Sequence, residues 1–221
     1  MNNPNGFWSW FETIAPQLAL RQPSFTKIFS YLSEIALRKP VIIVETGCMR
    51  TPDNWAGDGQ SSVLFDKFLE FAPHGGRGYA IDIDPEATRI CANSVSNRIQ
   101  VLTGDSVSTL RAIGKELAQR GETIDLLYLD SYDVNWDYVT PSAVHHLKEL
   151  VSIAHALSPE TLVMVDDSPS TCFCLPGDQG QLSVLMQPKI DGKGKYVAEY
   201  AQQIGAELLF SHYQSAWRRF V

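Results

Sequence analysis

Hydrophobic residues in this chain fall into short β-branched runs that alternate with segments of helical periodicity. The first run is Val-Ile-Ile-Val at 41–44, and apolar residues at helical spacing begin right after Ser61-Ser62. Four further runs predict strands at 78–84, 99–103, 124–129 and 161–165, and helical segments follow at 85–95, 107–120, 141–157 and 194–204. Five such strand-then-helix units predict a parallel sheet with right-handed crossovers and helices on both faces.

The two ends of the chain depart from this alternation. Residues 207–213 and 215–220 predict two strands joined by a tight turn. An aromatic-rich stretch at 7–21 and an amphipathic helix capped by Ser24 predict N-terminal helices. We therefore expect an α/β fold, Rossmann-like and doubly wound, whose mostly parallel seven-stranded sheet carries a C-terminal antiparallel hairpin and an N-terminal helical cap. The expected domains are the cap at 1–39 and a ligand-binding domain at 40–221.

The N-terminal helices have two interpretations. They either pack on the body of the domain, or they cover the site or form a dimer contact through Trp8, Trp10 and Phe11. Exposed aromatic side chains would make a homodimer plausible.

Composition and charge narrow the class of protein. A chain of 221 residues with 44% hydrophobic and 19% charged residues is typical of one globular domain. Its net charge of −7 favours neither nucleic acid nor an anionic membrane as a partner, and we expect the basic stretches at 189–195 and 218–219 to be solvated. No apolar run approaches the roughly 18 residues of a membrane span. We see no secretion signal and no disulfide-framework spacing among the four cysteines, so we expect a cytoplasmic location.

Acidic residues follow all five expected parallel strands. They are Glu45, Asp82, Asp105, Asp130 and the pair Asp166-Asp167. Ligands of open α/β sheets bind at the carboxyl ends of the strands, and helix capping alone does not explain an acid at every one of them. Such carboxylates can accept hydrogen bonds from ribose hydroxyls, an amino group and an adenine amine, and several together can hold a divalent cation.

The loop after the first strand bears on the cofactor. A dinucleotide prefers G-x-G-x-x-G at that position, whereas this chain has Glu45-Thr-Gly-Cys-Met-Arg with a single early glycine. An acid facing the ligand would also repel a phosphate group. S-adenosylmethionine, which carries sulfonium and ammonium groups, fits this loop better.

These motifs resemble the class I S-adenosylmethionine-dependent methyltransferases over about residues 40–221. More narrowly, they are similar to the metal-dependent small-molecule O-methyltransferases of the catechol and macrolide-sugar type. The resemblance implies a cofactor site whose methionine end meets Glu45, Gly47, Gly59, Ser61 and Ser62, whose ribose meets Asp82, and whose adenine meets Asp105 and Ser106. It also implies Mg²⁺ held by Asp130, Asp166 and Asp167.

Two departures from the family pattern change the expected chemistry. The first loop is lengthened from Thr51 to Asp58, which makes Trp55 a candidate lid on the cofactor. The catechol-type enzymes carry a lysine base three residues after the first metal ligand, where this chain has Asp133. We therefore expect either an aliphatic or sugar hydroxyl as acceptor or a mechanism that uses another base, and the candidate bases are Asp133 and a non-liganding oxygen of Asp130.

The expected function is Mg²⁺-dependent O-methylation of a small hydroxylated molecule. Three alternatives stay open, namely a metal-independent methyltransferase of the same fold, a nucleotide- or NAD-binding enzyme, and a non-catalytic binding module. We expect His146 to pack on the apolar face of its helix and His145 to be solvated. Residues 171–195 are expected to form either a mobile surface loop or a substrate lid.

Overall fold

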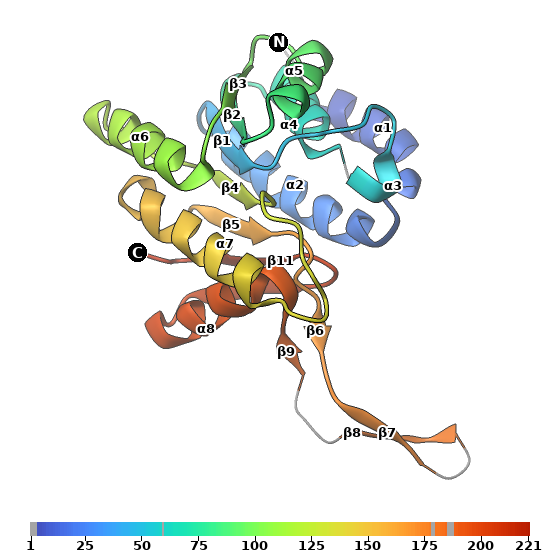
Figure 1. Ribbon diagram of the computed structural model, residues 1–221. Coiled ribbons are helices and arrows are strands. Elements are labelled where there is room, and N and C mark those ends of the chain that lie inside the picture. Colours follow the sequence, from blue (N-terminus) through green and yellow to red (C-terminus); the bar gives the residue numbers. More distant parts are fainter. Residues whose placement is uncertain (1–3, 59, 178–179, 185–187) are drawn as a thin grey trace.

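A computed structural model describes residues 4–58, 60–177, 180–184 and 188–221. Seven strands form one sheet in the order β10-β11-β5-β4-β1-β2-β3 (Figure 1). Their bounds are β1 Val41–Thr46, β2 Gly76–Asp82, β3 Ile99–Thr103, β4 Leu126–Leu129, β5 Leu162–Val165, β10 Glu207–Ser211 and β11 Ser215–Arg218. Strands β1 to β5 are parallel, whereas β11 is antiparallel to both β5 and β10. The predicted doubly wound fold with a C-terminal hairpin is confirmed.

Helices cover both faces of the sheet because alternate residues of each central strand point to opposite sides. Ile43 of β1 belongs to the core beneath helices α1, α2, α4 and α5, while Ile42 and Val44 face α6, α7 and α8. The helix bounds are α1 Pro4–Ile14, α2 Gln22–Ala36, α3 Trp55–Asp58, α4 Ser61–Phe71, α5 Pro85–Ser94, α6 Ser106–Gln119, α7 Thr140–Ile153 and α8 Lys195–Ile204. Two short 3-10 segments also matter for the site, at Ala15–Arg21 and Gly192–Gly194.

The N-terminal helices pack on the body of the sheet. The ring of Phe11, which the sequence suggested for a cover or a dimer contact, is buried and lies 5.4 Å from the ring of Phe29. Trp8 and Trp10 are half-buried against the same aromatic core. Burying large aromatic rings is strongly favourable, which explains why these side chains turn inward. The domain boundary at residue 39 and the homodimer stay predictions.

The described strands between residues 170 and 190 form an arm that extends from the sheet (Figure 1). Strand β6 (Ser170–Thr171) pairs with β9 (Lys189–Ile190), and β7 (Cys174–Pro176) pairs with β8 (Leu182–Val184), both antiparallel. The parts of the expected lid at 178–179 and 185–187 lie outside the described residues. Across the described ranges, none of the helices is long and apolar enough to cross a membrane.

Candidate active site

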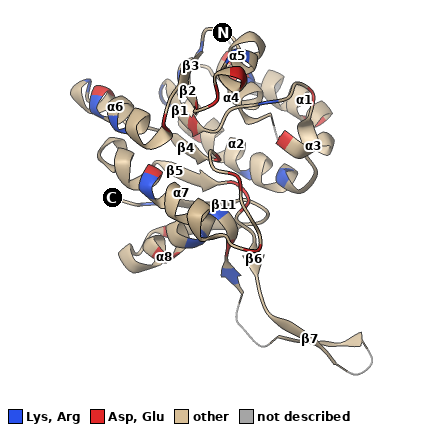
Figure 2. Ribbon diagram, in the orientation of Figure 1, with Lys and Arg blue, Asp and Glu red and all other residues tan. Residues whose placement is uncertain are grey.

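The loops that follow β1, β2 and β4 enclose a cavity at the carboxyl edge of the sheet. Its volume is about 200 Å³, and it is lined by Gly47, Cys48, Arg50, Asp58, Ser61, Asp82, Ile83, Asp84, Asp130 and Ser131. Acidic segments follow these strand ends in Figure 2. The structure therefore brings Gly47, Ser61, Asp82 and Asp130 together at one cavity, as the strand-end pattern predicts.

Gly47 allows the loop after β1 to approach the loop after β4. Its backbone φ is +75°, and a Cβ atom at this position would lie 2.5 Å from the carbonyl oxygen of Asp130. The Gly47 amide donates to the carbonyl of Ile81 at 2.8 Å, which ties the same turn to β2. Only glycine fits both the left-handed conformation and the close contact.

Glu45 lies directly behind the cavity wall. Its carboxylate is buried, and its Oε2 accepts a hydrogen bond of 2.8 Å from the hydroxyl of Ser61, which lines the cavity. Its Oε1 finds no hydrogen-bond partner among the residues that the structure describes. Burial raises the pKa of Glu45 well above its usual value. An unpartnered buried oxygen costs roughly 1–3 kcal/mol, so this atom is suited to accept a bond from a ligand or water.

Two other residues of the predicted cofactor site, Asp82 and Ser62, accept hydrogen bonds from backbone amides of the same loops. The Asp82 carboxylate accepts the backbone amides of Cys48 at 3.2 Å and of Asp84 at 2.9 Å. The Ser62 hydroxyl accepts the amide of Met49 at 3.4 Å. Gly59 lies outside the described residues. Trp55, the candidate lid, is half-buried and packs against the aromatic core.

The predicted adenine motif lies outside the cavity lining. The Asp105 side chain is exposed and caps α6 by accepting the amide of Ser108 at 2.8 Å, as aspartate at an N-cap commonly does. The Ser106 hydroxyl bonds to His145 Nε2 at 3.0 Å. The contact of these two residues with adenine stays a prediction.

The two histidines of α7 have different outcomes. His146 is fully buried, with Nδ1 2.7 Å from the carbonyl oxygen of Ser142, so the packed-histidine prediction is confirmed. The expectation that His145 is solvated is wrong, because its ring is largely covered and lies 3.3 Å from the buried carboxylate of Glu149 one turn later. Glu149 also accepts hydrogen bonds from Thr46 and Ser131, in the segments that present Gly47 and Asp130.

The three predicted metal ligands form a cluster. Asp130, Asp166 and Asp167 each place one carboxylate oxygen within 4.8 Å of the others. Asp166, however, already holds the guanidinium of Arg21, with Nε 3.0 Å from Oδ1 and Nη2 2.8 Å from Oδ2. It also accepts the side-chain amide of Gln214 at 2.7 Å. Both oxygens of Asp166 are therefore engaged by protein donors.

Lys193 provides a second cation to this cluster. Its ammonium bonds to Asp130 and lies 3.1 Å from Asp167 Oδ2, and the hydroxyl of Tyr213 donates to the other oxygen of Asp167. The expectation of a solvated basic stretch is wrong at Lys193, which is only 1% exposed. Burial lowers the pKa of Lys193, but the neighbouring carboxylates more than offset this and hold the pKa above its usual value, so the side chain is a cation.

A magnesium ion does not fit this cluster with Lys193 in place. Mg²⁺ needs oxygen ligands in near-octahedral geometry at about 2.0–2.1 Å. The ammonium of Lys193 already bonds both Asp130 and Asp167, and Arg21 holds Asp166. The clustering of the carboxylates agrees with the sequence prediction, whereas their pairing with lysine and arginine argues against the metal.

The two candidate bases have different surroundings. Asp133 is 72% exposed and pairs with Arg50 at 3.0 Å. Burial, followed by the nearby charge of Asp166, raises the pKa of Asp130 well above its usual value, although Lys193 opposes the shift. A carboxylate with a raised pKa is a stronger proton acceptor than an ordinary exposed one. Asp130 is therefore the more buried and the more basic of the two carboxylates.

Sequence reasoning missed Arg21 and Lys193. Both lie outside the strand-then-helix units, so the rule that ligands bind at strand ends does not locate them. The signal for Lys193 is its position between Gly192 and Gly194, because glycine is used where the backbone approaches another segment closely. For Arg21 the signal is a single cation at the end of an otherwise uncharged stretch, Ala-Pro-Gln-Leu-Ala-Leu.

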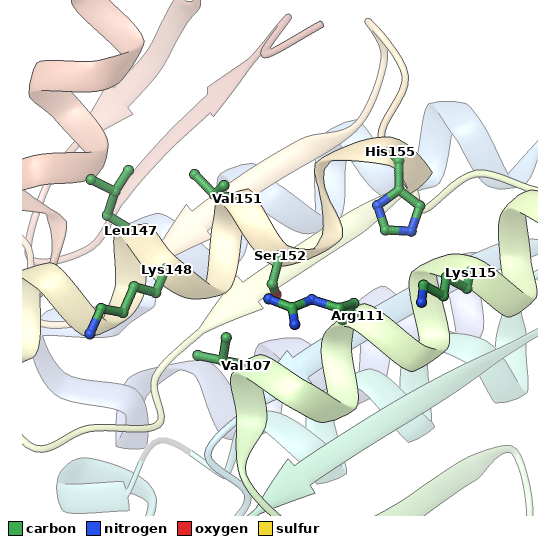
Figure 3. Close-up of a pocket in the computed structure, with 8 residues that line it drawn as sticks. All are labelled: Val107, Arg111, Lys115, Leu147, Lys148, Val151, Ser152 and His155. Carbon is green, nitrogen blue, oxygen red and sulfur yellow. The ribbon is translucent and has the colours of Figure 1, made fainter.

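A separate groove lies between α6 and α7 (Figure 3). Its volume is about 660 Å³, and it is lined by Val107, Arg111, Lys115, Leu147, Lys148, Val151, Ser152 and His155. None of the predicted site residues is among them. We therefore place the candidate active site at the carboxyl edge and not in this groove.

Comparison with known proteins leaves the activity open. No protein-family model matches the sequence, and no curated protein is similar to it. Among solved structures, the chain is similar to the MycE methyltransferase of the mycinamycin pathway in complex with Mg and SAH, with 17% identity and a TM-score of 0.44 over 66% of this chain. This chain spans about a third (32%) of the length of MycE.

Two further similarities extend over most of the chain. A putative rRNA methylase from Clostridium thermocellum has 11% identity and a TM-score of 0.47, covering 86% of this chain and 94% of the methylase. The DhpI–SAH complex has 9% identity and a TM-score of 0.45, covering 96% of each chain. We assign no activity from similarities at this level.

Proposed function

We propose that this chain is an S-adenosylmethionine-dependent methyltransferase that methylates a hydroxyl group of a small molecule of sugar or natural-product type. The observation that carries the proposal is the acidic cavity at the ends of β1, β2 and β4. Four of its lining side chains are acids, Asp58, Asp82, Asp84 and Asp130, against the single cation Arg50. Such a wall favours a ligand with positive charge and disfavours a pyrophosphate.

The residues around this cavity fit the groups of that cofactor. The Asp82 carboxylate, at the end of β2, would accept hydrogen bonds from the ribose hydroxyls. It would use the lone pairs that the backbone amides of Cys48 and Asp84 leave free. The unpartnered Oε1 of Glu45 and the hydroxyl of Ser61 would receive the amino group of the methionine part. S-adenosylmethionine, when bound, supplies the methyl group. NAD would instead bring a pyrophosphate to this acidic wall.

Asp130 would take the proton of the acceptor hydroxyl. Its carboxylate lines the cavity, and its raised pKa makes it the better acceptor of the two candidate bases. Lys193 and the contact with Gly47 hold the Asp130 segment in position. Asp133, paired with Arg50 at the surface, would contribute to the entrance of the cavity.

A Mg²⁺-dependent form of the same reaction is the second candidate, favoured by the clustering of Asp130, Asp166 and Asp167. It would require the ammonium of Lys193 to leave Asp130 and Asp167 before a metal could bind. For this reason we prefer the metal-independent form.

Calorimetric titration with S-adenosylmethionine tests the proposal. We expect one site in the wild type and at least about tenfold weaker binding in Asp82→Ala, because the ribose hydroxyls lose a charged acceptor. Asp137→Ala, an exposed acid outside the cavity lining, is the matched control and should bind like the wild type. Equal affinity in Asp82→Ala and the wild type would contradict the assigned site. Heat with NAD in place of S-adenosylmethionine would favour the NAD alternative. Cofactor binding without methyl transfer to any hydroxylated acceptor would favour a binding module.

A further inference from the structure

The backbone around Lys193 is shaped to bring this side chain into the carboxylate cluster. Gly192 has a φ of +63°, and a Cβ atom there would overlap the carbonyl oxygen of Asp167. On the other side, a Cβ atom at Gly194 would lie 2.5 Å from the Cβ of Ser168. Because neither flanking residue has a side chain, the turn lies directly against the segment after β5, and the amide of Lys193 donates to the carbonyl of Asp167 at 3.0 Å.

The ammonium of Lys193 has the contacts of a bound cation. It bonds to the Asp130 carboxylate, lies 3.1 Å from Asp167 Oδ2, and lies 3.4 Å from the carbonyl oxygen of Asp130. Its oxygen partners therefore come from two strand ends, β4 and β5, which are the same two that the predicted metal would join. Burying an ammonium is costly unless charge and hydrogen bonds compensate, and here both do.

The charge of the cluster depends on Lys193. Asp130, Asp166 and Asp167 carry three negative charges when all are ionised, and Arg21 neutralises one of them at Asp166. Without Lys193, two negative charges would remain at oxygens close enough to share an ion, which is the balance that a divalent cation satisfies. With Lys193, one of those two charges is already compensated and the space between Asp130 and Asp167 is occupied.

We propose that Lys193 is the resident cation of this cluster: its ammonium takes the place of a divalent metal ion, joins the ends of β4 and β5, and keeps the wild-type chain from binding a metal there. The inference deepens the proposed function by naming the cation of its site, and Lys193 acts as a positioning residue through Asp130 and Asp167. The inference is tested by metal binding and not by methyl transfer. The inference can therefore fail while the proposed function holds, and the proposed function can fail while the inference holds.

The experiment is a titration with Mn²⁺, with free Mn²⁺ measured by electron paramagnetic resonance. The wild type and Lys195→Met, a lysine two residues away that does not contact the cluster, should show no saturable site. Lys193→Met, which keeps the aliphatic stem and removes the charge, should bind one Mn²⁺ with an affinity at least about tenfold above the detection limit at which the wild type shows no site. Adding Asp167→Asn to Lys193→Met should abolish that site.

Two results would overturn the inference. One is a saturable site in the wild type that Asp167→Asn removes. The other is folded Lys193→Met and Lys193→Ala variants that bind no Mn²⁺. Circular dichroism with and without Mn²⁺ checks folding, and a variant that folds only when Mn²⁺ is added supports the inference. If neither variant folds with or without Mn²⁺, the titration of the wild type decides. A saturable wild-type site that Asp167→Asn removes overturns the inference, and the absence of a saturable site in the wild type supports it.

Discussion

Arg21 and Asp166 form a bidentate ion pair between residues 145 positions apart in the chain, with Nε–Oδ1 and Nη2–Oδ2 distances of 3.0 and 2.8 Å. The arginine ends the 3-10 segment after the first helix, and the aspartate follows β5. The N-terminal segment therefore contributes directly to the carboxylate cluster, and the same guanidinium lies 5.0 Å from the ring of Tyr213.

We expect Arg21→Met to lower the free energy of unfolding by about 3–5 kcal/mol, because removal of one partner leaves a buried carboxylate without its counter-charge. The side chains of Arg21 and Asp166 are only 11% and 1% exposed. Arg38→Met is the matched control, since its pair with Glu160 is exposed and should contribute less than about 1 kcal/mol. Urea unfolding of both variants measures the difference. Equal losses would show that Arg21 has no special role in stability.

Gly47→Ala is expected to destabilise the chain through two effects, backbone strain at positive φ and a clash with the Asp130 carbonyl. Gly121→Ala separates them, because Gly121 also has a positive φ (+67°) but its Cβ would meet nothing within 4 Å. We expect about 1 kcal/mol for Gly121→Ala and at least about 1–3 kcal/mol more for Gly47→Ala. Thermal unfolding compares the two. A similar loss of stability in both variants would mean that the segment after β4 moves away from a Cβ atom at position 47 at little cost, which would contradict this prediction.

Stability should fall in mild acid because of His146. Burial lowers its pKa from an ordinary 6.5 to about 4, although the nearby Glu149 opposes the shift. The unfolded chain therefore binds a proton at this residue that the folded chain does not bind between these pH values. The contribution of neutral His146 to the free energy of unfolding is fully present above pH 6.5 and is lost as the pH falls toward 4. Between pH 7 and pH 5 the free energy of unfolding should fall by about 2 kcal/mol for this reason.

Replacement of His146 tests that contribution. His146→Phe should lower stability at pH 7 and should also reduce the dependence of the free energy of unfolding on pH by about 2 kcal/mol over this interval. Glu149, His145 and Lys193, the titratable side chains that act on the charge of this ring, are unchanged in the variant. Parallel curves for the variant and the wild type would mean that His146 takes up its proton in the folded chain.

The choice of base gives a further prediction. Asp130→Asn should reduce methyl transfer at least about 100-fold, because it removes the proton acceptor. Asp133→Asn, at an exposed carboxylate paired with Arg50, should change the rate less than about fivefold. Single-turnover rates under saturating S-adenosylmethionine separate the two. The reverse order would return the role of base to Asp133.

The sequence was sufficient to predict the strands and helices that are specified by local hydrophobic periodicity. Alternating periodicity located β1 within two residues of its end and α6 within one residue of each end, because buried strands and amphipathic helices have different hydrophobic periods. That Asp130, Asp166 and Asp167 lie at one edge of the sheet followed from the parallel strands that end there, and their choice as one set came from the family resemblance. Apart from that choice, each of these inferences needs only neighbouring residues and the topology of the sheet.

The partners of those acids required the tertiary structure. Arg21 reaches Asp166 because the N-terminal aromatic residues pack against Phe29 and Phe68 in the core beside the sheet. Lys193 reaches Asp130 because two glycines let its turn lie against Ser168. Neither placement follows from hydrophobic period or charge pattern alone. The antiparallel pairings of β6 with β9 and of β7 with β8 were missed because these strands are only two or three residues long.

The most direct measurement is calorimetric titration of the wild-type chain with S-adenosylmethionine, once in EDTA and once in Mg²⁺. We predict one site with the same affinity in both conditions, because the acidic cavity binds the cofactor and Lys193 supplies the cation. Absence of heat in both would contradict the proposed methyltransferase function. Binding that needs Mg²⁺ would instead contradict the resident-cation role of Lys193 and restore the three aspartates as metal ligands.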